Sequence, residues 1–180
     1  QLQGLQQLDV SFNGLEDVPE IFMGMAKLKE ANFSHNLLVG FPRSIAAASS
    51  LKLLDLSFNR LQGLPDEIGN LISLEDLDIS NNGILVLAPS LGNLKRIKRI
   101  NAEKNGLTPG SVAPSLLRDT PLENLRMDGN PLTTLQKEDG YEEYEKRFKK
   151  TSLKNIDQRV RTGDLSQGLG TAEQYAQMRK

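Results

Sequence analysis

The sequence predicts an α/β solenoid with a curved parallel β-sheet on its concave side and short helical or 3₁₀ returns on its convex side. Three observations lead to this fold class. An asparagine-centred frame of apolar residues recurs six times along the chain. Each frame contains the apolar–polar alternation of a short strand with one buried face. An amphipathic segment follows the last frame and predicts a C-terminal capping helix.

The frame recurs at nearly constant spacing. Its asparagines are 23, 23, 23, 23 and 25 residues apart. Each follows apolar residues eight, five and three positions earlier and precedes another two positions later, as Leu51, Leu54, Leu56 and Leu61 surround Asn59. Six frames in phase indicate a repeat architecture in which each coil covers its neighbours. The six asparagines are Asn13, Asn36, Asn59, Asn82, Asn105 and Asn130.

Each frame predicts one strand and one return. The apolar residues five and three positions before the asparagine flank a polar residue, the pattern of a strand with its apolar side inward. A second apolar set follows the asparagine and marks the returning chain, as in residues 64–71. Pro65 lies in that segment, and proline tolerates an extended conformation or the first position of a helical turn. Short helical or 3₁₀ pieces are therefore expected on the convex side.

The asparagines are expected inside the solenoid for a polar reason. Where the chain leaves each strand, backbone N–H and C=O groups face inward without a ladder partner. A side-chain amide offers both donors and an acceptor for these groups. We therefore predict a structural asparagine ladder that connects one repeat to the next.

The motif L-x-x-L-x-L-x-x-N-x-L resembles the leucine-rich repeat family across residues 2 to about 135. The resemblance implies a repeat array over residues 1–135 with six recognisable repeats. Leu2 has the spacing of a residue that ends a preceding repeat. Since terminal repeats need polar caps, we expect the N-terminus to be cut within a repeat.

Residues 136–150 are expected to form the capping helix. Tyr141, Tyr144 and Phe148 are spaced as one helical face that closes the end of the core. Their pattern G-Y-x-x-Y-x-x-R-F resembles the C-terminal helix of a small cytosolic member of the family. Residues 151–180 contain few apolar side chains and predict an extended tail. A capping box at 171–174 predicts a short helix over 172–180 within it.

Composition narrows the function classes. The chain has 180 residues, 38% hydrophobic content and a net charge of −1, which suits one elongated domain and gives no global attraction to nucleic acid. It has no apolar run long enough for a transmembrane segment. It also has no cysteine, so the disulfide caps of secreted repeat proteins are absent and a cytoplasmic location is expected. No catalytic, metal or cofactor site is expected.

The outward strand positions and the turn after them hold the candidate binding residues. Phe12, His35 and Phe58 recur at one repeat position and form either an aromatic docking stripe or partial packing. An aspartate at another repeat position suggests acid–base chemistry, but the sequence supplies no thiol and no second histidine to act with it.

Charge is uneven along the predicted array. Asp55 and Asp78 make the third and fourth strands acidic, whereas Arg99 and Arg126 lie on the fifth and sixth. Opposite charges on neighbouring strands either offset like-charge repulsion or form a bipolar face that orients a charged partner. These four charged residues, together with Phe12, His35 and Phe58, are the predicted partner contacts.

The function expected from these features is protein–protein scaffolding without catalysis, through the concave face and the tail. A partner or a larger complex would then hold residues 151–180, because a segment with so few apolar residues folds only on binding. Two alternatives remain open. One is an architectural subunit of a large assembly, such as a ciliary axoneme or organelle complex, and the other is the regulatory array of a larger signalling enzyme.

Overall fold

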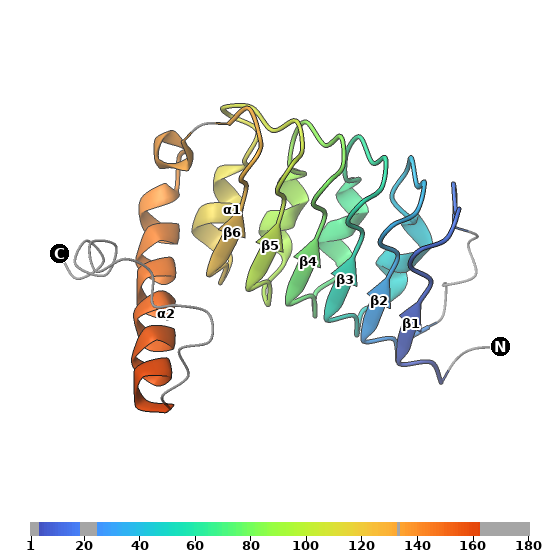
Figure 1. Cartoon of the computed structure of the whole chain (residues 1–180), viewed down its shortest axis with the longest axis horizontal. Coiled ribbons are helices and arrows are strands. Elements are labelled where there is room, and N and C mark those ends of the chain that lie inside the picture. The colour runs from blue at the N-terminus through green and yellow to red at the C-terminus, as the bar shows by residue number, and fades with distance from the viewer. Residues whose placement is uncertain (1–3, 19–24, 133, 163–180) are drawn as a thin grey trace.

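The computed structural model describes residues 4–18, 25–132 and 134–162. Six short strands form one parallel sheet in chain order (Figure 1). Residues pair with those 23 positions later, as Gln7 pairs with Glu30, except that the last pairing, Arg99 with Asn124, spans 25 positions. The sequence spacing of the frame is therefore the register of the sheet. The strands are β1 (Gln7–Asp9), β2 (Glu30–Asn32), β3 (Leu53–Asp55), β4 (Asp76–Asp78), β5 (Arg99–Asn101) and β6 (Asn124–Arg126).

The returns on the opposite side are short helices. Among the described residues, three returns contain a 3₁₀ helix, η2 (Arg43–Ala47), η3 (Asp66–Asn70) and η4 (Pro89–Asn93), and one contains the α-helix α1 (Pro114–Asp119). The α-helix lies in the return between β5 and β6. Paired residues of these two strands are 25 positions apart instead of 23, so this repeat is two residues longer than the others. Neighbouring returns approach closely: a Cβ at Gly69 would lie 2.8 Å from the carbonyl oxygen of Ser90, so the position requires glycine. The predicted fold class is confirmed.

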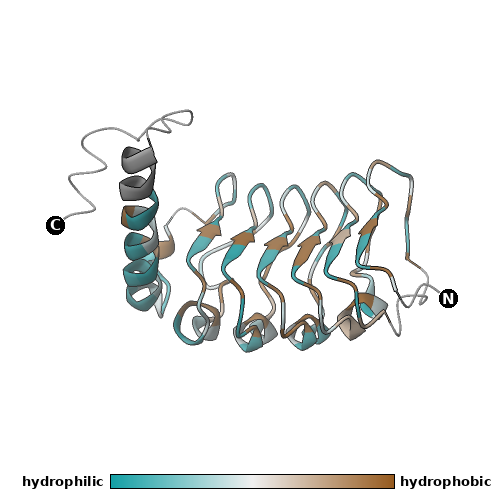
Figure 2. Ribbon diagram, turned by 90° about the horizontal axis from the view of Figure 1, so that it is seen from below, coloured by the Kyte–Doolittle hydropathy of each residue, from teal (hydrophilic) through white to brown (hydrophobic). Residues whose placement is uncertain are grey.

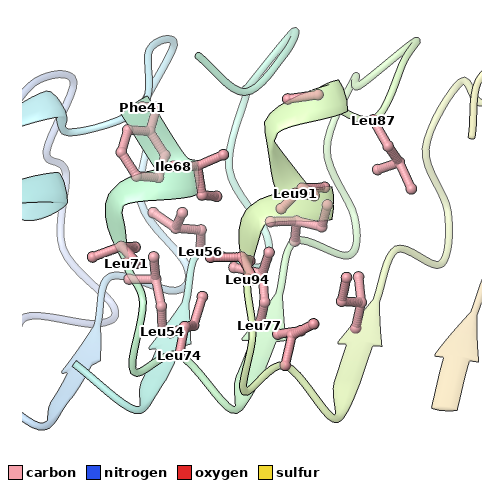
Figure 3. Close-up of a cluster of buried hydrophobic side chains, with 14 of the residues drawn as sticks. Phe41, Leu54, Leu56, Ile68, Leu71, Leu74, Leu77, Leu87, Leu91 and Leu94 are labelled. Carbon is pink, nitrogen blue, oxygen red and sulfur yellow. The ribbon is translucent and has the colours of Figure 1, made fainter. Parts of the chain in front are cut away.

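The hydrophobic core lies between the sheet and the returns (Figure 3). Leu54, Leu56 and Leu74 point into it from the strand side, and Ile68 and Leu91 reach it from the returns. All five side chains are fully buried. Each such side chain contributes roughly 1.5–3 kcal/mol of transfer free energy, so neighbouring coils depend on one another for stability.

The ladder asparagines bond both within and between repeats. The Asn59 amide nitrogen donates to the carbonyls of Leu56 and Ser57 in its own repeat and of Phe33 in the preceding one, over 3.0–3.1 Å. Its amide oxygen accepts the Leu38 N–H at 3.0 Å. Asn36, Asn82 and Asn105 make the same set of contacts, and Asn130 makes a closely similar one. Asn13 differs, because within the described residues its amide donates to Val10 and Ser11 of its own repeat and not to a neighbouring repeat.

Helix α2 (Tyr141–Thr162) covers the end of the array beyond β6, opposite the N-terminal end (Figure 2). Tyr144 is buried there, and its hydroxyl oxygen accepts the Leu125 N–H at 2.9 Å. Tyr141 and Phe148 are partly buried against the core on either side of it. Arg147 donates from Nε to the Leu122 carbonyl at 3.1 Å, which ties the helix to the last repeat. β6 is an edge strand of the sheet. Through these bonds α2 supplies hydrogen-bond partners to backbone groups of the last repeat.

The predicted helix boundaries are wrong at both ends. Residues 135–137 form the 3₁₀ helix η5 (Leu135–Lys137), and α2 begins only at Tyr141, after Gly140 adopts a φ of +87°. The helix then continues to Thr162, so residues 151–162 are not an extended tail. No glycine or proline lies between Gly140 and Gly163, and a nucleated helix propagates through such a stretch at little cost. Leu2 and residues 163–180, with the predicted helix over 172–180, lie outside the described residues.

Candidate protein interface on the concave face

The exposed face of the sheet, here called the concave face, carries two rows of outward side chains. One row is Gln7, Glu30, Leu53, Asp76, Arg99 and Asn124, and the other is Asp9, Asn32, Asp55, Asp78, Asn101 and Arg126. A hollow of about 460 Å³ lies over β3–β6. The four charged residues predicted as partner contacts all line it: Asp55, Asp78, Arg99 and Arg126.

The three aromatic-position residues form a continuous stack, here called the aromatic ridge (Phe12, His35 and Phe58). The Phe12 and His35 ring centroids are 4.1 Å apart, and those of His35 and Phe58 are 4.2 Å apart. The rings are nearly parallel, at 10° and 11°. Phe12 is 75% exposed and Phe58 46% exposed, so the ridge is accessible to a partner. The structure therefore brings these three residues together, but outside the residues that line the hollow.

An unusual backbone conformation positions the ridge. Phe12, His35 and Phe58 have φ angles of 53–54°, in the left-handed region. This conformation costs a non-glycine residue roughly 1–2 kcal/mol. The asparagine that follows each ridge residue closes the turn by donating to the carbonyls two and three residues before it. The ladder thus holds the turn, and ring stacking adds about 0.5–1.5 kcal/mol for each pair.

The aspartates of the concave face stabilise the same turns. A side-chain oxygen of Asp55 accepts the Ser57 N–H at 2.9 Å, and one of Asp78 accepts the Ser80 N–H at 2.9 Å. Asn32 and Asn101 make the equivalent bond in their repeats, to the N–H two residues later. Since an amide replaces the carboxylate at these positions, the turn requires only an oxygen acceptor. The negative charge of Asp55 and Asp78 therefore remains available to a partner.

The arginines of the concave face bind carboxylates of the neighbouring repeat. Arg99 donates to both side-chain oxygens of Asp76, to Oδ2 at 2.6 Å. Arg126 forms an ion pair with Glu103 at 2.7 Å. The carboxylate of Asp76 raises the pKa of the Arg99 guanidinium above its ordinary value. Of the two interpretations of the uneven charge, this geometry favours offset repulsion, because the basic side is compensated internally.

The lysines before β3 and β5 are compensated in the same way. Lys98 binds Glu75 at 2.8 Å, and Lys52 binds the other oxygen of Glu75 at 3.5 Å. The Lys98 hydrogen bond and charge lower the pKa of Glu75, and Glu75 in turn raises the pKa of Lys98. Within the described part of the chain, no cluster of three histidine, aspartate or glutamate side chains is arranged to hold a metal ion. The geometry therefore offers contact surface and charge to a ligand.

Comparison with known proteins agrees with this architecture. Two leucine-rich repeat family models match the chain, over residues 3–61 and 73–94. An internalin, InlF of Listeria monocytogenes, superposes with a TM-score of 0.62 at 18% identity, over 75% of this chain and 45% of its own. The fold is a leucine-rich repeat solenoid.

Two further solved structures share the leucine-rich repeat fold. The functional domain of InlJ from Listeria monocytogenes, which includes a cysteine ladder, gives a TM-score of 0.61 at 21% identity, over 74% of this chain and 27% of that one. A leucine-rich repeat protein of Leptospira interrogans gives 0.58 at 24% identity, over 78% and 40%. The chain thus spans less than half the length of each of these structures. No curated protein matches the chain.

Sequence reasoning overlooked several features of this leucine-rich repeat solenoid. The left-handed position was readable from the sixth repeat, where glycine, Gly129, takes the place of the ridge residue with a φ of +76°. Arg147, present in the C-terminal motif, was not identified as a residue that anchors α2. Only weak sequence evidence indicated the ion pairs of Arg99 and Arg126, since opposite charges at one repeat position do not reveal in which direction the side chains point. No helix in the described ranges has both the length and the apolarity needed to cross a bilayer.

Proposed function

We propose that this leucine-rich repeat solenoid is a non-enzymatic scaffold that binds a protein partner through its concave face. The observation that carries the proposal is the exposure of large apolar side chains directly outside a fully buried core. Phe12 is 75% exposed, Phe58 46% and Leu53 40%, whereas Leu54, the next residue after Leu53, is fully buried. Exposed aromatic and aliphatic side chains on a rigid support are typical anchors of protein interfaces.

The rigidity of the support explains how binding would gain affinity. Strands β2–β5 are held on both sides by parallel pairing and from behind by the ladder, so their exposed side chains have fixed positions before a partner arrives. A preformed surface loses little conformational entropy on binding. The hollow over β3–β6 adds a concave seat beside these anchors. Its lining also contains Asp55 and Asp78, which form no ion pair with a described residue and can orient a charged partner.

The C-terminal motif bears on where the protein acts. Gly140, Tyr141, Tyr144, Arg147 and Phe148 match a C-terminal pattern that resembles leucine-rich repeat-containing protein 57, a small cytosolic protein. This likeness, with the absence of cysteine from the sequence, supports a cytoplasmic setting. Residues 163–180, which are poor in apolar side chains, would add contacts to the partner.

Site-specific photo-cross-linking in native cells tests the proposal. A photoreactive residue at Leu53, in the hollow, should give a discrete covalent adduct with a partner protein. The same residue at Arg43, on the exposed surface of η2, should give none. The double variant Phe12→Ala/Phe58→Ala should lose the adduct but remain folded, with a melting temperature lower by roughly 2–12 °C, because both ring stacks on His35 are lost. Adducts at Arg43 and none at Leu53 would contradict a concave interface.

A further inference from the structure

We propose that the concave face over β1–β4 binds an extended, basic segment of a partner protein, with lysine or arginine at alternate positions. This inference rests on the proposed function, because it names the chemistry of the partner at the same face. It depends on three features of the described residues: the charge left uncompensated, the spacing of that charge, and the orientation of the aromatic ridge.

The uncompensated charge on this face is negative. The eight outward positions of β1–β4 include five carboxylates and no basic residue. Asp76 is neutralised by Arg99. The other four carboxylates, Asp9, Glu30, Asp55 and Asp78, form no ion pair with any described residue. The nearby cations Arg99, Arg126 and Lys98 are each already bound to a carboxylate of a neighbouring repeat. A ligand that approaches these outward positions therefore meets four carboxylates that lie outside any ion pair, while Lys29, beside Glu30, donates to Gln6 Oε1 at 2.9 Å.

The spacing of the carboxylates suits an extended chain that crosses the strands. Asp9, Asp55 and Asp78 occupy the same row on β1, β3 and β4. Parallel strands lie about 4.8 Å apart, so Asp9 and Asp78 are separated by roughly 14 Å. Side chains at positions i and i+4 of an extended peptide point the same way and are also separated by roughly 13–14 Å. Basic side chains at positions i and i+4 can therefore face Asp9 and Asp78, and one at i+2 lies within roughly 3 Å of the level of Asp55, a gap that a long basic side chain spans.

The aromatic ridge lies beside the acidic row, at the carboxyl ends of β1–β3. Both faces of His35 and one face each of Phe12 and Phe58 are covered by a neighbouring ring, because the centroids are only 4.1–4.2 Å apart. The stack therefore presents ring edges outward, and these carry the positive end of the ring quadrupole. Ring edges suit aliphatic side chains and backbone carbonyl oxygens, whereas cations prefer ring faces. The basic groups of the partner are thus directed to the carboxylates, and its aliphatic side chains or backbone contact the ridge.

The hollow supports the same assignment. Asp55 and Asp78 lie on neighbouring strands and both line it, together with the exposed Leu53. The arginines of its other wall are neutralised by Asp76 and Glu103. One lysine or arginine of the partner would place its charged group between the two carboxylates and its aliphatic stem against Leu53. This leaves the end of the hollow over β5 and β6 for polar contacts.

The chain supplies a substitution that removes charge while it keeps the fold. Asn32 and Asn101 already make the turn bond that Asp55 and Asp78 make. The triple variant Asp9→Asn/Asp55→Asn/Asp78→Asn should therefore fold, with a modestly lower melting temperature, because the second side-chain oxygens of Asp9 and Asp78 no longer accept from the Asn32 and Asn101 amides. A matched control, Asp66→Asn/Glu67→Gln/Glu142→Gln, removes the same charge from η3 and the start of α2, away from the concave face.

The test measures binding of synthetic peptides to the full chain by fluorescence anisotropy, at low and high salt. The probes are a short peptide of alternating lysine and valine, its glutamate–valine counterpart, and a peptide of the same lysine and valine content in two blocks. We expect the alternating lysine peptide to bind about tenfold or more tightly than both others, with an affinity that falls as salt rises. The triple asparagine variant should lose about tenfold or more of this affinity, and the matched control should lose none.

Two results would overturn the inference. One is equal binding of the alternating lysine and glutamate peptides, and the other is undiminished lysine-peptide binding by a correctly folded triple variant. Equal binding of the alternating and block peptides would reject the extended geometry. These failures are distinct from failure of the proposed function: a Leu53 adduct with a partner that lacks a basic segment would keep the scaffold and refute its charge preference.

Discussion

Replacing Asn59 by leucine removes one amide from the middle of the ladder, and the structure allows the cost to be worked out bond by bond. The amide nitrogen donates to the carbonyls of Phe33, Leu56 and Ser57, and the amide oxygen accepts the N–H of Leu38. All four bonds are lost in Asn59→Leu. The effect on stability depends on which of the four backbone groups then has no partner.

The three carbonyl groups each keep a second donor. The Phe33 carbonyl still accepts from the Asn36 amide, the Leu56 carbonyl from the Asn82 amide, and the Ser57 carbonyl from the His35 N–H. The N–H of Leu38, a fully buried residue, loses its acceptor, the Asn59 amide oxygen. One orphaned buried donor costs about 1–3 kcal/mol in free energy of unfolding. For a chain of this length that corresponds to a fall of roughly 2–12 °C in melting temperature.

Asn13→Leu is the matched control. Asn13 is exposed and donates only to Val10 and Ser11 of its own repeat, where water can replace it. We expect a loss of about 0.5 kcal/mol or less, as for other surface substitutions. Chemical denaturation monitored by circular dichroism measures both variants. Equal destabilisation by Asn59→Leu and Asn13→Leu would refute the assignment of the cost to the bond between repeats.

Three further predictions concern the cap and the returns. Tyr144→Phe should destabilise the array by about 1–3 kcal/mol in denaturant melts, because the Leu125 N–H loses its acceptor. Burial raises the pKa of the Tyr144 phenol above its ordinary value of 10.0. Its contribution to stability should therefore persist below about pH 10 and disappear as the pH rises through the raised pKa. The pKa of Tyr141 is raised as well, so absorbance at the tyrosinate band should show two late-titrating groups, of which Tyr144→Phe removes one. Gly92→Ala should cost about 1–3 kcal/mol, because its Cβ would lie 2.5 Å from Ser115 Oγ, whereas Gly40→Ala, with open space around it, should leave the melting temperature nearly unchanged.

The repeat architecture and its register could be predicted from the sequence because they depend on periodicity. A solenoid coil contacts mainly its neighbours, so a constant spacing such as that from Asn36 to Asn59 fixes which residues lie side by side. The same reasoning placed Phe12, His35 and Phe58 at one repeat position and predicted that Tyr144 covers the end of the core. Each of these features follows from local order repeated at a known interval.

Boundaries and side-chain pairings depended on the tertiary structure. Composition suggested that helical order ends at 150, but helix α2 docks on the last repeat through Tyr144 and Arg147 and then propagates to Thr162. Charge patterning left open whether Arg99 faces solvent or a neighbour, since a long side chain reaches several positions, and only its orientation toward Asp76 shows that the basic side of the face is neutralised. By itself, the sequence determined the coil, its spacing and its buried face, because these arise from contacts repeated at short range. The free charges of the concave face and the length of the cap were decided by three-dimensional packing, because both depend on which side chains meet across repeats.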